Sequence, residues 1–265
     1  MPYLDENKNS WNIRTEYHVQ SDFYNVKGFL EGETSLDEIT LDLIGDIKGK
    51  KILHLQCHFG LDTLSLARMG ADVTGMDLSD KAIDEARLLA EKAGLDAEFI
   101  CCDVYDLPNH LEGKFDMVYT SYGVIGWLPD MDKWAKIVTQ FLKPSGKFLF
   151  IEFHPVVWMF DDDLSKVSFR YFTSDAIIEE EKGTYAELDA PIEIKTVCWN
   201  HGIGEVVNAL ISNGLRIDSL DEYDFSPYDS FKHTVEVAPK RFQIKHFGDK
   251  IPMVYSVVGM KETDR

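Results

Sequence analysis

Residues 51–80 read KILHLQCHFGLDTLSLARMGADVTGMDLSD, and residues 98–108 read EFICCDVYDLP. An apolar strand at 51–55 runs into a turn that closes at Gly60. After a helix, a second strand ends on Asp77, and after another helix a third strand ends on Asp103. This alternation predicts a βαβαβ unit, the building block of an open parallel sheet with helices on both faces.

An acid follows the second strand and another follows the third. Ligands of open α/β sheets bind at the carboxyl ends of the strands, and an acid past the second strand suits the two hydroxyls of a ribose. Asp77, with its neighbour Leu78, is therefore the predicted ribose site. Asp103 and the backbone of Val104 are the predicted partners of an adenine ring.

The turn after the first strand is poor in glycine. A dinucleotide site needs G-x-G-x-x-G, because bare backbone must approach a pyrophosphate. Here the stretch is QCHFG (56–60), so side chains stand at positions 56 and 58 where phosphates would lie. The pattern favours an adenosine ligand without phosphates.

With these features the chain resembles the class I S-adenosylmethionine-dependent methyltransferases. That family's first motif reads acidic-x-G-x-G-x-G; here His54 replaces the acid, and Gln56 and His58 replace the first two glycines. Further segments resemble the family's later strands and helices, so that the resemblance covers roughly two-thirds of the chain. These segments are KFDMVYTSYGVIGWLPD (114–130), LKPSGKFLFIEFHP (142–155), VVNALISNGLRIDSLDEY (206–223) and IPMVYSVVGMK (251–261).

The resemblance implies S-adenosylmethionine as cofactor and methyl transfer to O or N of a small molecule. It places Gln56, Cys57 and His58 at the methionine end of the cofactor, and Ser121 near the sulfonium. Gly60 would let the backbone turn from strand to helix close to the ligand. Arg14 is a candidate partner for a carboxylate of cofactor or substrate. The departures in the first motif leave two alternatives open: a cofactor-binding regulator without catalysis, or a nicotinamide-dependent oxidoreductase.

A methyl acceptor that carries a proton needs a base, and histidine titrates near neutral pH. The candidates are His154 at the end of the fifth strand, His18 near the N-terminus, and His201. His54 and His58 have a metal-like spacing only on a helix, and they fall on a strand and its turn. No metal site is predicted.

The composition describes a globular protein with a net charge of −19 and 45% hydrophobic residues. Such a charge repels nucleic acid, and a neutral or cationic small molecule is the easier partner. No apolar run reaches the ~20 residues of a membrane helix. The polar N-terminus is unlike a secretory signal, and unpaired cysteines suit a reducing compartment, so a cytoplasmic protein is expected. Its oligomeric state stays open.

The chain is predicted to form a doubly wound, Rossmann-like sheet of seven strands, the last antiparallel. Residues 1–35 would be an arm over the site, and 36–265 the methyltransferase domain with an inserted antiparallel lid at about 156–202. Asp62, Ser79 and Asp130 are predicted helix caps. Within the lid, the acidic run 176–182 is predicted to be helical.

Overall fold

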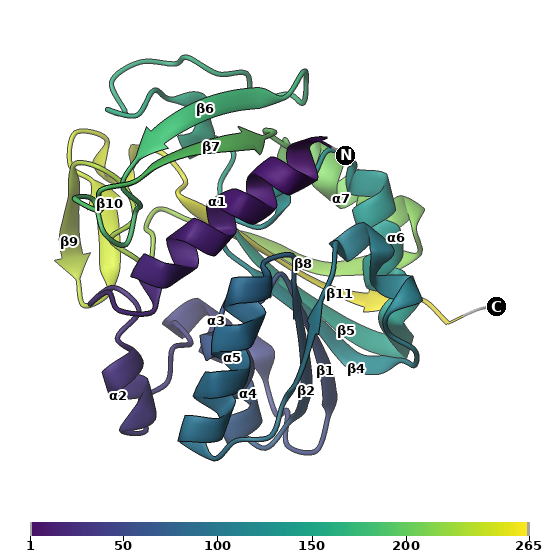
Figure 1. Ribbon diagram of the computed structural model, residues 1–265. Coiled ribbons are helices and arrows are strands. Elements are labelled where there is room, and N and C mark those ends of the chain that lie inside the picture. Colours follow the sequence, from purple (N-terminus) through teal and green to yellow (C-terminus); the bar gives the residue numbers. More distant parts are fainter. Residues whose placement is uncertain (1, 264–265) are drawn as a thin grey trace.

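A seven-stranded sheet forms the centre of the computed structural model, which describes residues 2–263 (Figure 1). Its strand order is β3–β2–β1–β4–β5–β11–β8. The last strand of the chain, β11, pairs antiparallel with β5 and β8, whereas β1 to β5 pair in parallel. The predicted fold class is confirmed. The bounds are β1 Lys51–Leu55, β2 Asp72–Asp77, β3 Glu98–Cys101, β4 Phe115–Ser121, β5 Leu142–Phe153, β8 Leu215–Tyr223 and β11 Val254–Lys261.

Helices cover both faces of this sheet and bury its apolar side chains. On one face α3 (Glu38–Ile44), α4 (Leu61–Arg68) and α5 (Asp80–Ala93) pack over the strands. On the other face lie α6 (Met131–Phe141), α7 (Ile203–Ser212) and the 3-10 helix η1 (Val104–Asn109). Because β1 to β5 are parallel, their carboxyl ends lie together at one edge of the sheet, and the loops that follow these strands gather there.

Local capping fixes where two of the helices begin. The hydroxyl of Ser79 accepts from the amide of Ala82 at 3.0 Å, and the carboxylate of Asp130 accepts from the amide of Lys133 at 2.9 Å. Both predicted caps are confirmed. The prediction that Asp62 caps α4 is wrong, because this helix follows Gly60 in the left-handed conformation and has no side-chain cap. Asp62 is thereby left to other partners.

Two antiparallel hairpins stand outside the central sheet. One joins β6 (Ile177–Lys182) to β7 (Glu193–Cys198), and the other joins β9 (Thr234–Ala238) to β10 (Arg241–Ile244). The predicted helix at 176–182 is wrong: β6 is a strand whose residues alternate in exposure and pair along their whole length with β7. The remaining short 3-10 helices are η2 (Ile125–Trp127), η3 (Val157–Met159) and η4 (Gly248–Lys250).

The N-terminal arm forms two helices, α1 (Pro2–His18) and α2 (Val26–Leu30). Figure 1 shows α1 running between the β6–β7 hairpin and α5, and α1 contacts both elements. The face that α1 buries is polar rather than apolar: Asn7, Ser10, Arg14, Thr15 and His18. A helix stabilised only by apolar packing would bury the opposite kind of face. The buried polar face needs hydrogen-bond partners, and only part of it finds them in β7 and in α1 itself.

Candidate functional site

The candidate site lies where β1, β2 and β3 end. Asp77 is the last residue of β2, and its carboxylate accepts from the amides of His58 at 2.8 Å and Ser79 at 2.9 Å. Burial raises the pKa of this carboxyl, while the backbone amides of Ser79, His58 and Leu78 oppose the shift. Asp77 thus ties the loop after β1 to the loop after β2. A carboxylate can accept about four hydrogen bonds, so acceptor capacity remains for a ligand.

The loop after β1 has a backbone of the kind that favours glycine. Gln56, His58 and Gly60 all have positive φ angles, of 55°, 51° and 81°. Glycine adopts this region without strain, whereas other residues need support from their surroundings. Gly60 has a further reason to be glycine, since a Cβ there would lie 2.9 Å from the ring of Phe99.

Contacts of the side chains hold Gln56 and His58 in this conformation. The Gln56 amide donates to the carbonyl oxygen of Val124 at 2.8 Å. The His58 ring stacks on Tyr24, with centroids 5.5 Å apart, and meets Trp11 edge-on. Cys57, between them, turns inward and is buried.

Helix α1 crosses the ends of these strands in their spatial order. Near its start, Tyr3 lies close enough to Asp103, past β3, for that charge to raise the tyrosine pKa after burial. In its middle, Asn12 accepts from the Ser79 hydroxyl at 2.6 Å, past β2. At its end, Nδ1 of His18 lies 3.3 Å from Nε2 of His58, past β1. Helix α1 therefore runs past the ends of all three strands, where an extended ligand would lie.

Several buried polar atoms along this path have no hydrogen-bond partner. A buried polar group without a partner costs roughly 1–3 kcal/mol, so such atoms call for a ligand or another compensation. The unpartnered atoms at the site are Tyr3 Oη, Ser10 Oγ, Arg14 Nε, His18 Nε2, Gln56 Oε1 and His58 Nδ1. This set includes hydrogen-bond donors and acceptors, and the carboxylate and amino groups of an amino acid would need one of each.

The other predicted cofactor residues lie at the same edge. The Asp103 carboxylate accepts from the amide of Tyr105 at 3.1 Å and caps η1, while Val104 is buried behind it. The carbonyl of Leu78 accepts from the Cys101 thiol at 3.6 Å. Ser121 ends β4 and points its hydroxyl to Asp62, at 3.5 Å.

Only one of the three candidate bases lies beside this loop. The His18 ring is fully buried, and burial together with His58 and Arg14 lowers its pKa to about 2. His154 instead bridges Glu222 at 2.8 Å and the amide of Val156 at 3.1 Å. His201 bonds the carbonyl of Leu128 at 2.7 Å and approaches Glu205 at 3.2 Å. Both ring nitrogens of His154 and His201 are thus engaged in holding segments together.

Two acids at this edge escaped the sequence reasoning. Burial raises the pKa of Asp62 to about 6, and its carboxylate accepts from Ser35 at 2.6 Å. Glu152 on β5 is buried and accepts from the amides of residues 123–125, which fixes the loop after β4. In the sequence, Asp62 has only the pattern of a helix cap, and Glu152 is only an acid within an apolar strand.

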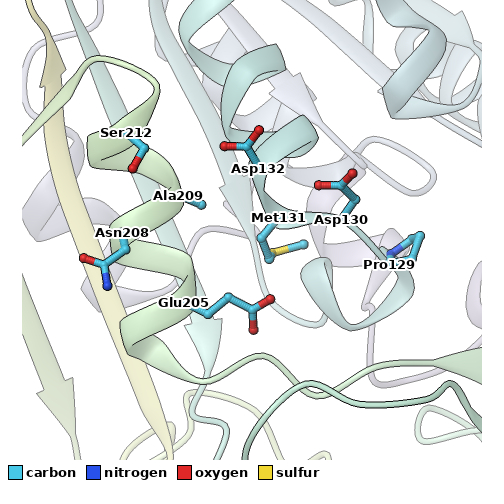
Figure 2. A pocket seen from close by; sticks show the side chains of 8 residues that line it. All are labelled: Pro129, Asp130, Met131, Asp132, Glu205, Asn208, Ala209 and Ser212. Carbon is cyan, nitrogen blue, oxygen red and sulfur yellow. The ribbon is translucent and has the colours of Figure 1, made fainter.

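A surface hollow of about 380 Å³ opens elsewhere, between α6 and α7 (Figure 2). Three carboxylates line it, from Asp130, Asp132 and Glu205, and none of the residues predicted to hold a cofactor does. We therefore place the candidate site at the strand ends. Among residues 2–263, no group of three or more His, Cys, Asp or Glu side chains is arranged to hold a metal ion. No helix in that range is long and apolar enough to cross a membrane.

Comparison with known proteins finds methyltransferases that resemble the chain. Residues 52–146 match the family model of a methyltransferase domain. The chain is 28% identical over 181 residues to a ubiquinone biosynthesis O-methyltransferase of Chromobacterium violaceum, which covers 64% of this chain and 72% of the relative. It is 32% identical over 123 residues to the enzyme of that name from Idiomarina loihiensis, covering 46% of each chain. The chain thus spans from about half to almost three quarters of these relatives.

Solved structures share the whole fold at low sequence identity. An S-adenosylmethionine-dependent methyltransferase from Mesorhizobium loti aligns with a TM-score of 0.59 at 23% identity, covering 88% of this chain and all of the other. A geranyl diphosphate C-methyltransferase from Streptomyces coelicolor aligns with a TM-score of 0.61 at 14% identity, covering 98% of each.

Residues 52–146 thus match a methyltransferase domain, and the whole chain has the fold of S-adenosylmethionine-dependent methyltransferases. These findings agree with the class I resemblance seen in the sequence.

Proposed function

We propose that the strand-end site binds S-adenosylmethionine and that the protein transfers its methyl group to an O or N atom of a small molecule. The observation that carries the proposal is the buried polar face of α1, which crosses the ends of β3, β2 and β1 with unpartnered polar atoms. Asp77 offers the ribose its remaining acceptor capacity, and Asp103 with Val104 offers hydrogen bonds to the adenine.

The methionine end falls to residues on both sides of the loop after β1. Arg14 is 3% exposed, lies over the rings of Trp11 and Trp127, and bonds Glu181 of β6 at 2.6 Å. Its Nε has no partner. A guanidinium in this position suits the cofactor carboxylate, and Gln56 Oε1 suits the ammonium.

The bound cofactor supplies an electrophilic methyl group on a sulfonium. The protein's part is then to align the acceptor with it, exclude water, and take up any proton that the acceptor loses. The arm at 1–35 and the lid at about 156–202 serve the first two tasks in this proposal. Tyr24 of the arm and Tyr185 of the lid already share a hydrogen bond beside His58.

Two measurements test the proposal. Calorimetric titration with S-adenosylhomocysteine is expected to show one site, whereas NAD is expected to bind far more weakly. Incubation with S-adenosylmethionine and a panel of small amines, phenols and alcohols is expected to yield S-adenosylhomocysteine with at least one acceptor. Preference for NAD would support an oxidoreductase instead, and cofactor binding without turnover across the panel would support a regulator.

A further inference from the structure

A cluster of aromatic side chains adjoins the proposed cofactor site. It consists of Phe23, Tyr24, Tyr122, Tyr185 and Tyr228, which we call the tyrosine cluster. Phe23 contacts Tyr185 and Tyr228 with centroids 5.4 and 5.9 Å apart, and Tyr122 meets Tyr228 edge-on at 5.1 Å. The members come from the arm, the loop after β4, the lid, and the segment after β8. All five are half-buried. Segments far apart in sequence thus converge on one place.

Asp62 places a carboxylate against this cluster. It accepts from the hydroxyl of Ser121, the residue next to Tyr122, at 3.5 Å. Its charge raises the pKa of Tyr228 after the effect of burial, and that of Tyr24 after the effects of burial and of Tyr185. The hydrogen bonds to its two oxygens come from neutral hydroxyls, those of Ser35 and Ser121. Asp37, the N-cap residue of α3, lies close enough to Asp62 to raise its pKa further, and within residues 2–263 neither acid forms an ion pair. A buried carboxylate without a cationic partner is costly, and a cationic ligand would compensate it.

Tyr122 is held in the cluster under backbone strain. Its φ of 42° lies in the left-handed region, which a bulky side chain rarely adopts. Glu152 secures this turn through the amides of Gly123, Val124 and Ile125. The Tyr122 hydroxyl is buried and has no hydrogen-bond partner. Strain that the surroundings enforce is typical of functional sites, and the free hydroxyl gives the site a group that awaits a ligand.

We propose that the methyl acceptor is a small amine, which enters between the rings of the tyrosine cluster as a cation and contacts Asp62. Aromatic faces attract ammonium groups, and the attraction grows when water is excluded. The proposal rests on the proposed function and narrows its acceptor from O or N to an amine nitrogen. The net charge of −19 favours the approach of such a cation.

The chemistry of the step is balanced. An ammonium R–NH₃⁺ first passes one proton to the Asp62 carboxylate. The freed lone pair on nitrogen forms the C–N bond to the methyl carbon while the C–S bond breaks and leaves its electron pair on sulfur. The products are the methylated ammonium R–NH₂⁺–CH₃ and S-adenosylhomocysteine, and protonated Asp62 returns its proton to solvent. The raised pKa of Asp62, to about 6, makes it a better proton acceptor than an ordinary aspartate.

Entry of the amine requires the rings to separate, since they now contact one another. The hydroxyls of Tyr24 and Tyr185 are joined by a hydrogen bond, so the arm and the lid must part there. This requirement agrees with the placement of both residues on segments outside the central sheet.

Binding of matched probes tests the proposal. Ethanolamine, benzylamine and phenethylamine would each be titrated against ethylene glycol, benzyl alcohol and 2-phenylethanol, with the protein saturated in S-adenosylhomocysteine. We expect at least one amine to bind roughly tenfold or more tightly than its alcohol. The variant Asp62→Asn should reduce that preference to less than about threefold, while Asp84→Asn, an exposed acid on α5, should retain it.

The outcomes separate the two proposals. Alcohols that bind as well as the amines, an Asp62→Asn variant that keeps the preference, or an absence of amine binding would each overturn the amine assignment. If S-adenosylhomocysteine still binds in those cases, and a phenol or alcohol is methylated, the proposed function stands with an oxygen acceptor. If S-adenosylhomocysteine itself fails to bind, the proposed function fails first. The fold of Asp62→Asn would be checked by thermal unfolding.

Discussion

Replacing Asp77 by alanine should weaken S-adenosylhomocysteine binding by roughly 2–3 kcal/mol, or about 30- to 150-fold in Kd. The carboxylate has about four acceptor positions. Two are taken by the amides of His58 and Ser79, at 2.8 and 2.9 Å, which leaves about one on each oxygen. Two ribose hydroxyls can use those positions, and the alanine variant loses both charge-assisted hydrogen bonds.

The same substitution also frees two backbone amides, so a smaller change is a useful companion. Asp77→Asn keeps one acceptor oxygen and the shape of the side chain, and should weaken binding by less than Asp77→Ala. Asp72→Ala, at the exposed opposite end of the same strand, is the matched control and should leave affinity unchanged. Calorimetry on variants with wild-type thermal unfolding is the assay. A folded Asp77→Ala protein whose affinity stays within threefold of wild type would refute the ribose assignment.

Three further outcomes are expected. Hydrogen exchange with and without S-adenosylhomocysteine should show α1 and the lid at 156–202 protected more strongly than α5; protection limited to the strand-end loops would exclude both from the pocket. His18→Asn should lower turnover or cofactor affinity roughly tenfold, because it removes the contact with His58. His154→Asn and His201→Asn should keep near-wild-type turnover once an acceptor is known. Equal losses of turnover in all three variants would contradict the placement of the site. Because the folded-state pKa of Asp62 is raised from 3.8 to about 6, ionising it costs stability as pH rises through that window. Asp62→Asn should therefore match wild type near pH 3.5 and be more stable by about 2–3 kcal/mol above pH 7 in urea unfolding, and a difference independent of pH would be inconsistent with a strained carboxylate.

The features that sequence predicted correctly are those set by local patterns. The end of β2 at Asp77 follows from an apolar run that stops at an acid, and the caps at Ser79 and Asp130 follow from side chains that reach amides three residues away. Strand order and the antiparallel β11 came from resemblance, since pairing between distant segments leaves little local trace.

The features that sequence missed depend on distant partners. Asp62 accepts hydrogen bonds from Ser35 and Ser121, which lie 27 and 59 positions away in the sequence. Its neighbours in the sequence indicated only the start of a helix. The acidic run 176–182 has the composition of a helix, but pairing with β7 gives it a strand conformation. Helix α1 lacks an apolar period because it buries polar groups, and no periodicity could have revealed it.

A crystal structure of the protein with S-adenosylhomocysteine tests the central claim most directly. We expect the ribose hydroxyls within hydrogen-bond distance of the Asp77 carboxylate, the adenine beside Asp103, and the amino-acid end between Gln56 and Arg14 beneath α1. Binding in the hollow between α6 and α7, or a ribose placed away from Asp77, would contradict the account.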